Sequence, residues 1–212
     1  MPFRPRLRGF LHTCAFVASV PAAATLVLAA RTGRATVAAS VYGLSLVAQF
    51  AVGALFHRVT WSLRARRWMG RLDHATINGL IAGTYTPIAL VLGSPLAIVS
   101  LVIIWVGALV GILIHVLWID ETPKWLSAGM YVVLGWTGVA AAPEFVSRVG
   151  WTPTALFALG GALYSAGAAV YTLRRPDPAP EVFGYHEVFH ALVITAAFVH
   201  YTAVAFWVLP QT

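Results

Sequence analysis

Charged residues are scarce in this chain of 212 residues. Asp and Glu number seven and Lys and Arg fourteen, so only 10% of the residues carry a charge, while 59% are hydrophobic. A soluble domain does not need so large an apolar fraction, and the composition is typical of a polytopic membrane protein. Cysteine is nearly absent as well. Cys14 stands alone, which excludes an intrachain disulfide.

Long apolar stretches, in contrast, fill most of the chain. About 20 apolar residues cross the ~30 Å hydrocarbon core of a bilayer, and seven stretches meet this length. Polar segments separate them, including the arginine-rich segment 58–72 and the segment from Asp120 to Lys124. We therefore predict an all-α fold, a single seven-helix transmembrane domain over residues 1–212, with spans near 9–30, 35–57, 74–93, 96–118, 125–142, 152–173 and 187–209.

Positive charges are distributed unevenly among the loops. Eleven Lys and Arg fall in the N-terminal segment, which includes Arg4, and in the second, fourth and sixth loops, whereas only Arg31, Arg34 and Arg148 fall on the other side. Because cytoplasmic loops are enriched in Lys and Arg, we predict a cytoplasmic N-terminus and an extracytoplasmic C-terminus. The same rule explains the net charge of +7, so we expect no binding to nucleic acid. The bias toward arginine and alanine is typical of GC-rich bacteria and favours a multi-pass protein of a bacterial cell (inner) membrane.

Most histidines share one depth in the predicted bilayer. The outer half holds almost no ionisable side chain, and Asp73 lies in the inner half, at the start of the predicted third span. Ionisable groups within membrane spans are costly and tend to mark function. The pattern therefore indicates a single polar site between the cytoplasmic helix ends, where six of the seven histidines fall: His12, His57, His74, His115, His186 and His190.

His186 and His190 stand four residues apart where the last span begins, so their imidazoles reach one point beside the helix. Such a pair is half of a zinc site, and a catalytic zinc needs a third protein ligand and an open position for water. His57 is the best third ligand because it lies at the matching depth on another helix. Asp73 is then suited to hold or deprotonate the metal-bound water, whose pKa zinc lowers to about 7.

Several of these residues have alternative roles. His12, His74 and His115 are each expected to pack or form hydrogen bonds inside the bundle, which is the commoner role of a lone histidine in a membrane span. Asp73 would alternatively cap the third helix with its carboxylate. His200 lies about 15 Å beyond the histidine pair at 1.5 Å per residue, too far to share its metal, so we expect a packing or supporting role.

Three segments resemble the hemolysin III family, which belongs with the adiponectin and progestin receptors in the PAQR group. They are Ala54–His57, Leu72–His74 running into Leu80–Pro87, and His186–His190 followed by Ala196–His200. The resemblance implies a seven-helix bundle with a cytoplasmic N-terminus. It also implies a zinc ion held by His57, His186 and His190, with Asp73 beside the metal water. Because the wider superfamily includes alkaline ceramidases, hydrolysis of a lipid amide is implied as the chemistry.

Three functions compete. The favoured one is zinc-dependent hydrolysis of a lipid amide or ester, with a membrane lipid as substrate. The second is a non-catalytic receptor, or a lytic, pore-like protein, with structural zinc. Relatives often carry serine four residues before the first ligand, and Gly53 in that position weighs toward this alternative.

The third function is intramembrane proteolysis, because His186–His190 matches H-E-x-x-H with Glu187 as the general base. Under the first two functions Glu187 has no catalytic role. We then expect Glu187→Gln to have little effect.

Overall fold

The computed structural model describes residues 5–118 and 122–212, so Arg4 and Asp120 lie outside the described residues. Seven of the described helical stretches are long and apolar enough to cross a membrane, which confirms the predicted all-α, seven-transmembrane-helix bundle. The helices are α1 Phe10–Ala29, α2 Gly33–Arg58, α3 Leu63–Leu92, α4 Pro95–Trp118, α5 Lys124–Trp136, α6 Ala142–Val149, α7 Trp151–Leu173 and α8 Tyr185–Ala203. The 3-10 turn η1 Thr137–Ala141 joins α5 to α6, and the π-helical turn η2 Val204–Val208 and the short η3 Leu209–Gln211 extend α8.

α3 begins well before the predicted third span, at Leu63 rather than at residue 74. The Ser62 side chain caps it by accepting a hydrogen bond from the Ala65 amide at 3.3 Å. Hydropathy located only the apolar part of this helix, because its first turns are rich in arginine and extend past the apolar stretch. The segment 58–72 is therefore mostly helical. Asp73 lies well inside α3, so its alternative role as the cap of that helix is wrong.

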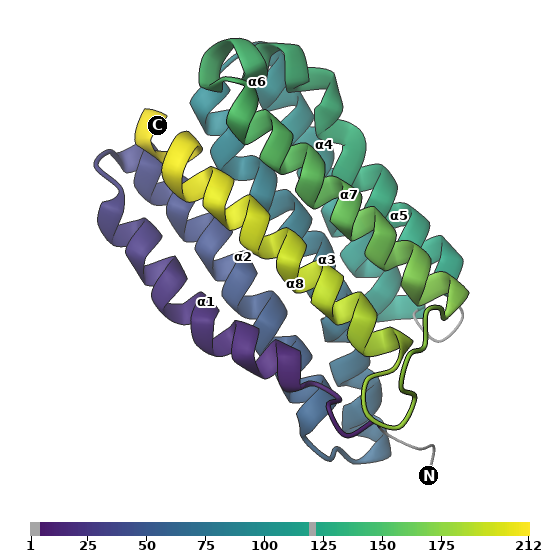
Figure 1. Cartoon of the computed structure of the whole chain (residues 1–212). Coiled ribbons are helices and arrows are strands. Elements are labelled where there is room, and N and C mark those ends of the chain that lie inside the picture. Colours follow the sequence, from purple (N-terminus) through teal and green to yellow (C-terminus); the bar gives the residue numbers. More distant parts are fainter. Residues whose placement is uncertain (1–4, 119–121) are drawn as a thin grey trace.

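The fifth span is also longer than predicted, reaching Val149, because a 3-10 turn continues the helical path where the apolar stretch ends. Neighbouring helices in the sequence pack against one another, and α8 contacts α1 as well as α7. Figure 1 shows α8 crossing the face of the bundle between these two helices, with the start of α1 and the C-terminus at opposite ends. We call the end at which α1 starts the N-terminal end of the bundle. α2 finishes and α8 begins at this end.

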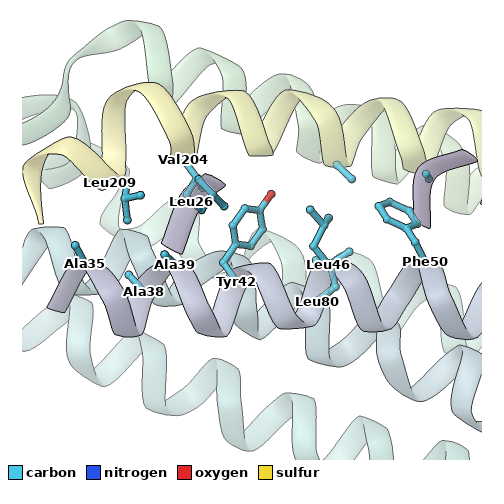
Figure 2. Close-up of a cluster of buried hydrophobic side chains, with 12 residues drawn as sticks. Leu26, Ala35, Ala38, Ala39, Tyr42, Leu46, Phe50, Leu80, Val204 and Leu209 are labelled. Carbon is cyan, nitrogen blue, oxygen red and sulfur yellow. The ribbon is translucent and has the colours of Figure 1, made fainter. Parts of the chain in front are cut away.

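Buried side chains fix α8 against α1 and α2. Tyr42, Leu46 and Phe50 project from α2 toward α8, as Figure 2 shows. Small residues such as Ala38 and Ala39 are fully buried beside them and let the helix backbones approach closely. The outer surface is apolar instead of polar, with large exposed side chains such as Leu28. The apolar surface suits a lipid surround, and the buried cluster fixes the later part of α8 and its extension against α1 and α2.

Candidate metal centre

Four histidines from three helices meet at the N-terminal end of the bundle. His57, from the last turn of α2, has its ring centroid 5.1 Å from that of His186 and 4.8 Å from that of His190. The two α8 rings are 4.3 Å apart, as their spacing predicts. His12, from the first turn of α1, lies 4.2 Å from His190 and 5.9 Å from His57. The structure thus brings the rings of the three predicted ligands together and adds a fourth imidazole, but the group whose ligand nitrogens lie close together contains His12 and not His186.

The ring nitrogens of this cluster are buried without partners. His12 Nδ1, His57 Nε2 and His186 Nε2 make no hydrogen bond within the described ranges. The ligand nitrogens of His12, His57 and His190 all lie within 4.8 Å of one another. Buried polar atoms normally have a partner, and leaving one unsatisfied costs about 1–3 kcal/mol. Imidazole nitrogens are ligands for zinc and related transition metals, so three buried histidines could form a metal site here.

Asp73 lies beside the cluster. Its Oδ2 is 3.8 Å from His57 Nε2, and its side chain is only 14% exposed. This separation is too long for a direct hydrogen bond. The predicted closeness of Asp73 to His57 is therefore present in the fold, across an α2–α3 contact.

Glu187 follows His186 directly, but its carboxylate is engaged elsewhere. It is 1% exposed, and its Oε1 accepts a hydrogen bond from Arg8 Nε at 2.5 Å. Its Oε2 accepts the Gly184 amide at 3.0 Å, which caps the start of α8. Both oxygens are committed to structure, which argues against the protease hypothesis, since that chemistry needs Glu187 as a base at the metal.

His74 and His115 belong to a second polar network beside the first. Their ring centroids are 5.6 Å apart. His74 Nδ1 donates to the Gly70 carbonyl at 3.0 Å, and His115 donates likewise to Gly111, leaving His115 Nε2 to accept the Tyr131 hydroxyl at 2.9 Å. The expectation that these two histidines form hydrogen bonds inside the bundle is confirmed.

His200 also has the supporting role expected for it. Its Nε2 donates to the Phe157 carbonyl at 3.1 Å, far from the cluster along α8. His12, in contrast, departs from the expectation of ordinary packing, because the fold places it among the predicted ligands. Two features of the sequence could have indicated this placement: the depth that His12 shares with the other histidines of the predicted inner half, and Gly53, one turn before His57.

A cavity of about 240 Å³ adjoins the histidines and extends into the bundle. Asp73, His186 and His190 line one end, and Phe157 and His200 line the other. The positions of His186 and His200 on α8 are ~21 Å apart at 1.5 Å per residue. Between them the wall is mostly aliphatic and aromatic. The cavity therefore suits a long apolar chain with a polar group at the histidine end.

The sequence matches a known family over nearly its whole length. The profile of the family described as Haemolysin-III related matches residues 2–201. Hemolysin-3 of Bacillus cereus is 31% identical over 203 residues, which cover 94% of this chain and 89% of that protein. The Hemolysin-3 homolog of Bacillus subtilis (strain 168) is 29% identical over 200 residues, covering 92% and 90%. The adiponectin receptor protein of Drosophila melanogaster is 29% identical over 168 residues, covering 71% of this chain and 38% of that protein.

Proposed function

This chain belongs to the Haemolysin-III related family of membrane proteins, and on that premise we propose that it is a zinc-dependent hydrolase of a lipid amide or ester. The proposed zinc ligands are His57, His186 and His190. One observation carries the proposal: unpaired buried imidazole nitrogens and a carboxylate lie together at the end of an apolar cavity. We place the site at the cytoplasmic face of a bacterial cell membrane, where it would take lipids from the inner leaflet.

The donor set fits the ion. Neutral imidazoles bind zinc through one ring nitrogen each, and unpaired nitrogens of His57 and His186 are available in the interior. When bound, zinc supplies Lewis acidity for a carbonyl oxygen and acidifies water.

The protein's own residues would orient the substrate and move the proton. The cavity would hold the acyl chain and bring its carbonyl to the histidine end, which converts the attack into a positioned, nearly intramolecular step. Asp73 Oδ2 would accept a proton from the attacking water and return it to the leaving amine or alcohol. Because the Asp73 side chain is only 14% exposed, bulk water has little access to the proton that it would carry.

Asp73→Asn tests the proposal, because it keeps the shape of the side chain and removes the proton acceptor. General acid–base catalysis contributes about 10²–10⁴-fold, so turnover should fall by that factor while zinc content is unchanged. Purified protein would be incubated in vesicles that contain ceramide or a phospholipid, with products measured by mass spectrometry and zinc by elemental analysis. Glu181→Gln makes the same chemical change on an exposed loop and serves as the control. Equal hydrolysis by the wild type and Asp73→Asn would refute the role of Asp73 in this mechanism.

A non-catalytic receptor or lytic protein with structural zinc is the second candidate. One observation favours it: the cluster holds a fourth imidazole, and structural zinc sites are four-coordinate and closed. Stoichiometric zinc in a protein that leaves every lipid unchanged would decide for this candidate.

A further inference from the structure

We propose that α1 supplies a fourth ligand, His12, to the metal centre, and that Gly53 makes room for it. This inference rests on the metal centre proposed above and extends it to a helix that the three-histidine set does not include.

His12 has the placement and the free atom that a ligand needs. Its side chain is among the most buried polar groups, at 3% exposure, and its ring meets that of His190 edge-on at 4.2 Å. Its Nδ1 has no hydrogen-bond partner in the described part of the chain. The ligand nitrogens of His12, His57 and His190 all lie within 4.8 Å of one another. An ion among them would give a partner to the buried nitrogens of His12 and His57 that have none.

Gly53 is the residue that admits this imidazole. A Cβ atom built at Gly53 would lie 2.6 Å from His12 Nδ1 and 2.8 Å from its Cε1. Real Cβ atoms do not tolerate contacts below 3.0 Å, so any other residue at position 53 would push the ring away. The absence of a side chain at position 53 of α2 thus leaves the space that the ring of His12 occupies.

The segment before α1 holds His12 in place. Two backbone hydrogen bonds join it to the loop before α8, from the Arg6 amide to Glu181 O at 3.0 Å and from the Leu7 amide to Val182 O at 3.2 Å. The ion pair between Arg8 and Glu187 adds a side-chain link. His12 lies one turn beyond this anchored segment, so its ring is positioned by contacts that do not depend on a metal.

A fourth imidazole changes the chemistry of the centre. Four protein ligands fill the tetrahedral sphere of zinc, whereas hydrolysis needs one position open for water or substrate. With His12 bound, the centre is closed. Turnover then requires His12 to leave the ion, which makes α1 the helix that controls access.

Cobalt(II) provides a test that does not depend on turnover, because its visible absorption reports the ligands around it. Wild-type protein, His12→Ala and Gly53→Ala would be purified, loaded with Co²⁺, titrated for affinity and then exposed to azide. His200→Ala and Gly79→Ala are the matched controls, since His200 lies at the far end of the cavity and a Cβ at Gly79 would meet no atom within 4 Å. Gel filtration checks that each variant is folded.

We expect the wild type and both controls to bind one Co²⁺ with a spectrum that azide does not alter. Loss of outer-shell groups alone weakens metal binding by 10–100-fold, so losing the ligand in His12→Ala should weaken it by at least about tenfold. The same loss is expected in Gly53→Ala, and azide should shift both spectra. An unchanged affinity in both variants, together with a wild-type spectrum that azide already shifts, would overturn the role of His12 while leaving a three-histidine centre intact. A loss in His12→Ala alone would overturn the role of Gly53. A wild type that binds no metal would overturn the proposed function itself.

Discussion

Glu187→Gln is expected to destabilise the protein without changing the metal content. The substitution removes the negative charge that Arg8 contacts at 2.5 Å in a site where Glu187 is 1% exposed. Hydrogen bonds to charged groups contribute about 1.5–3 kcal/mol, and removing one partner of a fully buried ion pair costs about 3–5 kcal/mol. Because the Arg8 side chain is 26% exposed and water can reach it, the lower range applies.

We therefore expect a loss of about 2 kcal/mol, which corresponds to a fall in Tm of about 4–8 °C for a chain of this length. A glutamine amide oxygen can still accept the Gly184 amide, so the helix cap survives this change. Glu187→Ala removes the cap as well and should cost about 1 kcal/mol more. The expectation from the sequence that Glu187→Gln has little effect on function stays a prediction, and the ion pair adds an expected loss of stability.

A double-mutant cycle isolates the pair. Thermal unfolding in detergent would be followed for Glu187→Gln, Arg8→Gln and the double variant, with Arg6→Gln as the control on the same segment, where the side chain is exposed. The two single changes should be strongly non-additive, as for groups in direct contact. Two results would contradict the reasoning. Additive effects would show that the pair is not coupled. Unchanged stability together with lost hydrolysis would make Glu187 a base and restore the protease hypothesis.

Three further outcomes are expected. His186→Ala combined with His190→Ala should remove bound zinc, measured by elemental analysis, whereas His74→Ala combined with His115→Ala should retain it. Tyr131→Phe should lower stability by about 1 kcal/mol, because it deletes the hydroxyl that His115 Nε2 accepts at 2.9 Å; an unchanged Tm would show that this hydrogen bond contributes nothing. Ala168→Phe should fill part of the cavity and reduce lipid hydrolysis at constant zinc content, whereas Ala162→Phe on the exposed face of α7 should leave the rate unchanged. Equal rates in these two variants would mean that the cavity does not hold the substrate.

Depth along the bundle could be predicted from the sequence, but rotation about each helix axis could not. Apolar stretches and the order of the spans place His57 and His186 at one end, where the structure also has them. No comparable signal in the sequence indicates how α1 is rotated about its own axis. Its residues are apolar nearly all round, because both lipid and the bundle interior accept such side chains, so no amphipathic stripe separates buried His12 from exposed Cys14.

Contacts between distant polar residues escaped prediction for a different reason. Arg8 and Glu187 are 179 positions apart. Each alone has an ordinary explanation in the sequence, Arg8 as an arginine of a segment predicted to be cytoplasmic and Glu187 as the second residue of the H-E-x-x-H motif. Their pairing follows from the packing of α8 against α1, which the spans themselves do not specify. The cavity could not be predicted either, because its size and lining depend on the spacing between helices.

Gly53 shows how the fold changes the meaning of one residue. From the sequence it signified a missing hydroxyl and weighed against catalysis. In the structure the space above it is filled by His12, so the same glycine indicates an added nitrogen donor. His12 also lines the cavity, together with Asp73, His186 and His190. A lipid that enters through the cavity would therefore lie against His12. A lipid that displaced the His12 ring would open the centre, and His12 would keep the centre closed while no lipid is present.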